Sequence, residues 1–220
     1  YLDYVEDIGT EVHVTNDEGY KFKSVDTFQK NFKLDTQNLT ENIDVAMEQN
    51  NLVAGNMYWP KKMLQLFAKE NEEETREALM LLFNEKIDIS ERINHTQAIF
   101  DELIIKRNKK LGETANSFIS LRFLSLLLGF HFPDKYPAVK PREWNVFCKY
   151  IDDDFRIPNG TSTGERYKVL CTYIDALNMK IRVLPEIQKI KDALTRGLDF
   201  TDSNYNWMTQ DVIYVTARII

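Results

Sequence analysis

Hydrophobic residues recur every three to four positions along most of the chain, and this spacing predicts helices. Met63, Leu64 and Phe67, for example, would share one face of a helix that begins at Pro60, since proline suits the first helical position. The same reasoning predicts helices over residues 38–50, 74–83, 88–110, 116–129, 141–153, 165–179, 183–196 and 206–220. The chain is therefore expected to be mainly α, a multi-helix domain of about eight helices.

The first 35 residues carry a different pattern. Glu11–Thr15 alternates polar and apolar residues, the next four residues are typical of a turn, and Tyr20–Lys23 alternates again. Alternation is the spacing of a strand with one buried face, so a short N-terminal β-hairpin is predicted. The expected organisation is a β-containing segment over residues 1–35 followed by a helical domain over residues 36–220.

The longest apolar run, Phe123–Phe132, belongs to the most hydrophobic of these helices. Asn116 or Ser117 is the expected N-cap, and Gly129 is the expected stop because glycine is favoured just after a helix. A turn bracketed by two prolines follows. The run predicts these buried side chains: Phe123, Leu124, Leu127, Leu128 and Phe130.

Composition adds that the chain can bury a sizeable core. Its 220 residues are 43% hydrophobic and 28% charged, as in an ordinary globular protein. Cys148 and Cys171 fall in apolar helical patterns, which favours reduced thiols in an intracellular protein. No signal peptide and no stretch long enough to span a bilayer is visible, so a cytoplasmic location without membrane contact is expected. Because the chain begins with Tyr1 rather than methionine, we expect it to be part of a longer protein.

Charge is distributed unevenly. The net charge is −6, which disfavours a generally basic nucleic-acid binder. Residues 1–105 carry a net charge of −11, residues 106–150 carry +6 and residues 151–220 carry −1. Residues 106–150 are thus a positively charged segment within an acidic chain. This indicates either a phosphate-facing patch or a solvated face with uneven charge.

The candidate DNA-contacting residues come from this segment. Cations bind phosphates, an aromatic ring can stack on a base, and the proline-bracketed turn would present its residues on a stiff backbone. Aromatic residues at helix junctions also fill the core, so the alternative interpretation of Tyr136 is a buried structural side chain. The predicted DNA-binding residues are Lys106, Arg107, Lys109, Lys110, Lys135, Tyr136, Lys140 and Arg142.

Motifs for catalysis and for cofactors are not visible. The chain has no phosphate-loop, dinucleotide-binding, serine-hydrolase or zinc-protease motif, and its three histidines lack partners at metal-ligand spacing. Asn159–Gly164 is rich in Gly, Ser and Thr but lacks a lysine, so a plain surface loop is expected. Asp152–Asp154 could hold Mg²⁺, although a solvated helix end is the simpler interpretation. We therefore expect no enzymatic activity, no cofactor and no metal in this segment.

A short segment resembles a known family. Leu124–Pro137 joins an apolar helix to Phe-Pro-Asp-Lys-Tyr-Pro, and Lys140 and a helix led by Trp144 follow. This arrangement resembles the helical N-terminal region of bacterial McrB-like restriction proteins. The closing segment Trp207–Arg218 is similar to the helix that ends such regions.

The resemblance implies a DNA-recognition or specificity module of an antiphage defence system. In that family an AAA+ motor, here expected after residue 220, works with a separate partner nuclease. The expected partners are therefore duplex DNA, which could carry modified bases, and the nuclease subunit. The alternative from the residues alone is a protein-interaction or assembly scaffold without nucleic-acid contact, which the acidic first half favours.

Overall fold

The fold is entirely helical in the part of the chain that the computed structural model describes, namely residues 1–48, 51–53, 59–151 and 154–219. Mainly α is thus confirmed, with twelve α-helices and one π-helical segment there rather than about eight helices. They are α1 Leu2–Ile8, α2 Thr10–Val12, η1 His13–Asp17, α3 Tyr20–Asn31, α4 Leu39–Ala46, α5 Pro60–Glu70, α6 Glu72–Phe83, α7 Ile89–Leu111, α8 Leu121–His131, α9 Pro141–Tyr150, α10 Thr163–Ile181, α11 Pro185–Leu194 and α12 Asn206–Ile219.

The predicted N-terminal β-hairpin is wrong. The segment Glu11–Thr15 belongs to α2 and η1, and Tyr20–Lys23 begins α3. Alternation over four or five residues does not distinguish a strand from a helix, and the longer spacing of the buried Phe22, Val25 and Phe28 is helical. Gly19 is not in a hairpin turn either, because it is the N-cap of α3 with φ −61° and ψ −19°. A side chain there would collide with the carbonyl oxygen of Val14. This glycine allows α3 to start close against the preceding helical segment.

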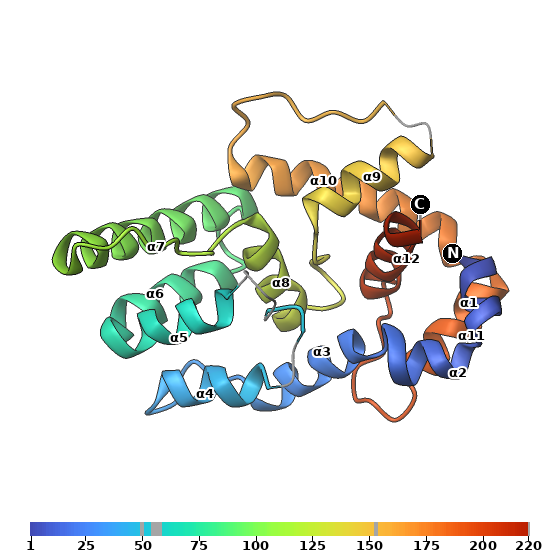
Figure 1. Ribbon diagram of the computed structural model, residues 1–220, viewed down its shortest axis with the longest axis horizontal. Coiled ribbons are helices and arrows are strands. Elements are labelled where there is room, and N and C mark those ends of the chain that lie inside the picture. Colours follow the sequence, from blue (N-terminus) through green and yellow to red (C-terminus); the bar gives the residue numbers. More distant parts are fainter. Residues whose placement is uncertain (49–50, 54–58, 152–153, 220) are drawn as a thin grey trace.

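α8 is the central helix of the fold. It packs against α3, α6, α7 and α10, while α5, α6 and α7 lie side by side at one end of the molecule (Figure 1). At the other end, α12 packs on α9 and α10, and α11 contacts α2. All five side chains predicted to be buried in α8 are fully buried. The sequence therefore identified the centre of the core correctly.

The predicted ends of α8 are both wrong. The helix begins at Leu121, after Ser120, because the side chains of Asn116 and Ser117 instead accept hydrogen bonds from nearby backbone N–H groups in a turn. It continues past Gly129 to His131. A Cβ on Gly129 would lie 3.1 Å from the carbonyl oxygen of Tyr136, so this glycine lets the following turn fold back onto the helix.

The remaining predictions of helices agree better with the structure. Asn38, where the predicted helix begins, caps α4, and its side chain accepts a hydrogen bond from Glu41 N. Asp88 caps α7, which ends at Gly112 in the left-handed region. The helix predicted over residues 141–153 ends at Tyr150, and residues 152–153 lie outside the described residues.

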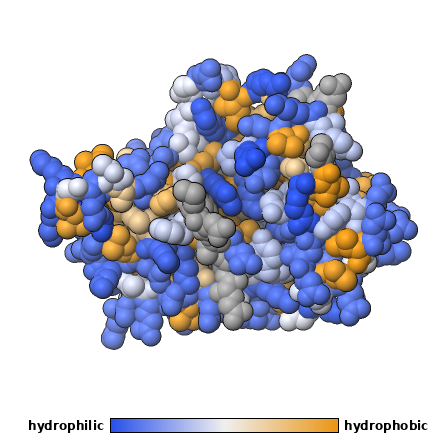
Figure 2. Space-filling view, viewed as in Figure 1, coloured by the Kyte–Doolittle hydropathy of each residue, from blue (hydrophilic) through white to orange (hydrophobic). Residues whose placement is uncertain are grey.

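The face of the molecule drawn in Figure 2 is mainly polar. Hydrophilic side chains cover most of it, and hydrophobic ones appear there as small separated groups. Within the described ranges, no helix combines the length and the apolar character that crossing a bilayer requires.

Candidate nucleic-acid interface

The ring of Tyr136 is not available to stack on a base. It is 9% exposed, and its hydroxyl accepts a hydrogen bond from Arg92 Nη2 at 2.6 Å and donates one to Glu85 Oε1 at 3.1 Å. The Tyr136 side chain therefore fills the core between the turn and the α6–α7 connection. This corrects its predicted role in DNA binding.

The two lysines near this turn are also occupied. Lys135 is exposed but pairs with Glu85, and that hydrogen bond raises the pKa of the lysine. Lys140 is half-buried, with Nζ 3.7 Å from the centre of the Tyr214 ring. Burial, followed by the charges of Lys21 and Arg122, lowers the pKa of Lys140 to about 7. Neither lysine presents a free cation to a phosphate.

The cations at the end of α7 are partly neutralised. Arg107 pairs with Glu113 at 2.6 Å and with Glu70 at 3.4 Å, and Lys106 lies 3.8 Å from Glu102. Lys109 and Lys110 are exposed, and so is Arg142 at the start of α9. α7 ends at the outer edge of the molecule, far from α9 (Figure 1), so the predicted residues do not form one patch.

A different surface gathers positive charge. A groove of about 740 Å³ lies between the start of α8, the helices α9 and α10, and the connection that joins these two helices. The part of that connection after residue 153 arches over α9 and α10 in Figure 1. Its lining residues are Gln97, Ser120, Leu121, Pro141, Trp144, Asn145, Lys149, Phe155, Arg156, Ile157, Asn159, Thr161, Thr163, Arg166 and Leu170.

Three exposed cations line this groove: Lys149, Arg156 and Arg166. Arg156 donates to the carbonyl oxygen of Phe155 at 2.6 Å, and Arg166 donates to that of Thr161 at 3.0 Å. These acceptors are neutral, so the hydrogen bonds orient the guanidinium groups without cancelling their charge. No carboxylate appears among the described lining residues. The groove can therefore bind an anion with donors that are already oriented.

The wall formed by α10 is fixed to α7. The side chain of Asn94 accepts a hydrogen bond from Gly164 N at 2.8 Å and donates one to Ser162 Oγ at 3.1 Å. A side chain on Gly164 would collide with the carbonyl oxygen of Ser90, so only glycine allows this close packing. The segment Asn159–Gly164, predicted to be a plain surface loop, is thus one rim of the groove.

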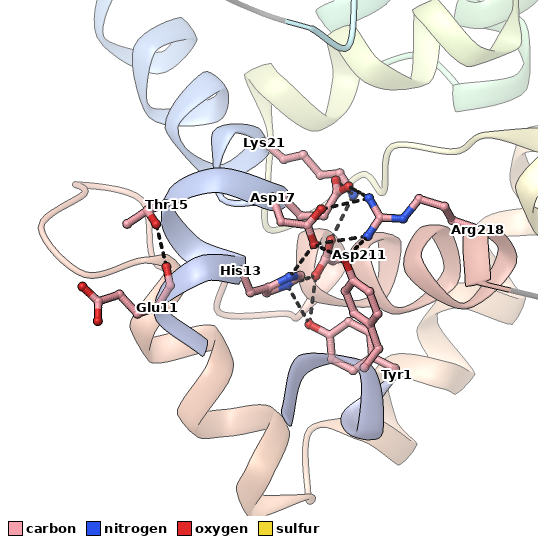
Figure 3. A network of polar contacts seen from close by, with 10 residues as sticks. Tyr1, Glu11, His13, Thr15, Asp17, Lys21, Asp211 and Arg218 are labelled. Carbon is pink, nitrogen blue, oxygen red and sulfur yellow. Dashed lines mark hydrogen bonds and ion pairs between the residues drawn. The ribbon is translucent and has the colours of Figure 1, made fainter. Parts of the chain in front are cut away.

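A buried ion network lies apart from the groove and joins the two ends of the chain (Figure 3). His13 Nε2 lies 2.8 Å from Asp211 Oδ2, and His13 Nδ1 lies 3.0 Å from Asp17 Oδ2. Lys21 Nζ reaches Asp211 Oδ1 at 3.0 Å. Arg218 on α12 pairs with Asp17 at 2.9 Å. Carboxylates on both ring nitrogens favour the doubly protonated imidazolium.

The pKa values in this network reflect mutual stabilisation of opposite charges. Burial alone would lower the pKa of His13, but the hydrogen bonds and charges of Asp211 and Asp17 outweigh it and raise that pKa. Burial would raise the pKa of Asp211, yet Lys21 and His13 lower it to about 2. The network therefore ties η1 and α3 to α12 as a structural clamp.

Metal binding has no visible site in the described parts of the chain, where no three potential ligands lie close enough together. Asp154 is exposed, while Asp152 and Asp153, which were considered as Mg²⁺ ligands, lie outside the described residues.

Comparisons with known proteins give no relative. No protein-family model matches the sequence, and searches of curated proteins and of solved structures likewise find no match.

The sequence did not single out the groove because its cations come from three separate segments. Lys149 lies in the last turn of α9, Arg156 follows in the connection and Arg166 lies in the first turn of α10. The available signal was the polar loop Asn159–Gly164 with an arginine on either side. A search for cations close together in the sequence favours the end of α7 instead.

Proposed function

We propose that this chain is a non-catalytic DNA-binding module and that its groove, rather than the predicted basic patch, contacts the phosphates. The observation that carries the proposal is the charge of the groove. Its lining has three exposed cations, and none of the described lining residues is a carboxylate, although the chain as a whole has a net charge of −6. Positive charge gathered in a concave site of an acidic protein is the electrostatic feature expected of a site for anions.

The resemblance to McrB-like restriction proteins supplies the biological setting of the proposal. In that setting the module would provide DNA specificity in a cytoplasmic defence system and would work with a motor and a partner nuclease. The segment that carries the resemblance has a structural role in this chain, since Tyr136 and Phe130 are buried. The support from the resemblance therefore concerns the type of protein and not the contact residues.

The test is duplex binding measured by fluorescence anisotropy between about 50 and 200 mM salt, a range over which phosphate contacts weaken strongly. If all three groove cations touch phosphates, the slope of log K against log salt should be about −2.7. The double variant Arg156→Ala/Arg166→Ala should bind more weakly at every sequence and reduce the magnitude of that slope by about 1.8. Binding of neither duplex nor single-stranded DNA at about 50 mM salt would contradict the proposal.

The matched control is Lys109→Ala/Lys110→Ala. It removes the same amount of charge from an exposed helix end that does not line the groove. We expect a much smaller loss of affinity from it. A larger loss from this control than from the groove variant would move the interface back to the end of α7.

The second candidate function is a protein-interaction or assembly scaffold. The observation that favours it is the exposure of apolar side chains where α10 meets α11: Met179 is 62% exposed and Val183 is 69% exposed. Neighbouring exposed apolar residues often mark a protein-binding surface. Absence of DNA binding at low salt, with the protein folded, would favour this alternative.

A further inference from the structure

We infer that the groove binds a single-stranded nucleic-acid segment one to two nucleotides long in preference to the backbone of an intact duplex. This inference rests on the proposed function and names the substrate class of the same site. It depends on three properties of the groove: its size, the presence of apolar, amide and cationic side chains in its lining, and the packing of its floor.

The size of the groove suits a small ligand. Its volume of about 740 Å³ lies within the range of about 300–1,000 Å³ that is usual for small-molecule sites. A duplex keeps its bases stacked inside and offers a concave site of this kind only sugars and phosphates. The phosphates of a duplex could touch the cations at the rim, but they would leave the interior of the groove empty.

The lining contains side chains of the kinds that suit the different parts of a nucleotide. The cations Lys149, Arg156 and Arg166 suit a phosphate. The apolar members of the lining are Leu121, Pro141, Trp144, Phe155, Ile157 and Leu170. Burying the face of a base removes apolar surface from water, which a duplex has already done by stacking. Only an unpaired base would gain from this apolar part.

Amide side chains complete the match. Gln97, Asn145 and Asn159 line the groove, and each carries both a hydrogen-bond donor and an acceptor. An unpaired base exposes donors and acceptors on its Watson–Crick edge, and proteins read single strands through that edge. In a duplex these atoms are already paired. The amides therefore add a second reason to prefer a single strand.

The floor is held by contacts between its own aromatic side chains. Trp144 packs edge-on against Phe155, with ring centres 5.5 Å apart, and Phe155 packs edge-on against Tyr173 at 4.4 Å. Trp144 and Phe155 are 5% and 7% exposed, so their rings are held by neighbouring side chains. A rigid floor lowers the ordering cost of binding. The buried rings offer no open face for stacking, so the apolar contact of a base would come from the half-buried apolar members of the lining.

The experiment compares two ligands with the 220-residue chain: a fluorescein-labelled 12-nucleotide single strand of mixed sequence and the blunt duplex of the same sequence. Anisotropy at about 50 mM salt keeps phosphate contacts strong. We expect the single strand to bind at least about tenfold more tightly, a difference of about 1.4 kcal/mol. Equal or tighter binding of the duplex would overturn the inference.

A groove-filling variant tests the place of binding without changing charge. Asn145 is exposed on α9 and lines the groove, so Asn145→Trp should occupy its interior. We expect single-strand affinity to fall at least about tenfold, or about 1.4 kcal/mol. Gln37→Trp is the matched control, because it adds the same exposed ring on the α3–α4 connection away from the groove. Unchanged single-strand affinity in Asn145→Trp would contradict the inference.

The outcomes separate this inference from the proposed function. Duplex binding that Arg156→Ala/Arg166→Ala weakens, without preference for the single strand, keeps the DNA-binding function and rejects the single-strand site. Failure to bind either ligand rejects both. Circular dichroism and the thermal midpoint of each variant establish that it is folded, so that a loss of binding reports on the groove.

Discussion

At the scale of single residues, Tyr136 in the proline-bracketed turn acts through the hydrogen bonds of its buried hydroxyl and not through an exposed ring. Arg92 is 1% exposed, and its guanidinium donates to the carbonyl oxygen of Leu82 at 2.9 Å and to Tyr136 Oη at 2.6 Å. Few acceptors are available to a charge at this depth. The Tyr136 hydroxyl therefore stabilises a buried cation as well as filling the core.

The variant Tyr136→Phe tests this role. It keeps the ring but removes the acceptor for Arg92, so the free energy of unfolding should fall by about 1–3 kcal/mol. Urea denaturation measures the change. Because the ring is buried, we expect DNA affinity to stay within about twofold of the original chain, a difference of about 0.4 kcal/mol. A Tyr136→Phe protein as stable as the original chain would show that the buried Arg92 does not depend on this hydroxyl.

The same residues show what sequence reasoning resolves at this scale. Leu127 could be assigned to the core from its place in an apolar run, because burial of leucine needs no specific partner. Tyr136 could not be assigned so simply, since an aromatic residue in a stiff turn suits either a surface or a core. Its role depends on Glu85 and Arg92, which come from the α6–α7 connection and from α7.

At the scale of helices, spacing predicts that an element exists better than it predicts where the element ends. The five apolar positions of α8 fixed its buried face, but both predicted ends were wrong because Asn116 and Gly129 have other roles. Asn116 forms a local turn, and Gly129 makes room for the backbone at Tyr136. In the N-terminal segment, a short alternation was consistent with both a strand and a helix. Long-range packing determined these features, and one sequence does not display it.

Helices α7 and α10 pack so closely that no side chain fits at one point of their contact. Gly164 lies where a Cβ would meet the backbone of Ser90, and backbone cannot move as easily as a side chain. We expect Gly164→Ala to lower the free energy of unfolding by about 1–3 kcal/mol through overpacking. It should also weaken nucleic-acid binding, because Arg166 is carried by the first turns of α10.

Urea denaturation and anisotropy together check the prediction for Gly164. Glu165→Ala, an exposed change at the adjacent position of α10, is the control and should change stability by less than about 0.5 kcal/mol. A Gly164→Ala protein as stable as the original chain would show that α7 and α10 can separate without cost.

At the scale of the whole molecule, both the groove and the ion network unite distant segments. The groove draws its cations from α9, α10 and their connection, and its amide Gln97 comes from α7. The ion network joins residues about 200 positions apart, as in the Arg218–Glu18 pair at 3.0 Å. The sequence displayed the charges but not their neighbours. Net charge by segment therefore could not show that cations from separate segments line one groove.

The network should make stability depend on pH in a defined window. The folded pKa of Asp211, about 2, lies below its ordinary value of 3.8. A lowered carboxyl pKa contributes stability that is fully present above the unfolded pKa and is lost as the pH falls through the folded pKa. The stabilising charge of Asp211 should therefore be complete above about pH 4 and disappear towards pH 2.

The variant Asp211→Asn isolates this contribution. Near pH 5 it leaves Lys21 and His13 buried without their shared carboxylate, so the free energy of unfolding should fall by about 3–5 kcal/mol. Urea denaturation of both proteins from pH 5 to pH 2 gives the difference between them, in which the titration of more distant carboxylates cancels. That difference should shrink below about pH 4, because the original chain also loses the Asp211 charge as the pH falls. A difference that stays constant down to pH 2 would mean that Asp211 stabilises the fold through its shape and hydrogen bonds, and the charge balance between the two ends of the chain would have no part in holding them together.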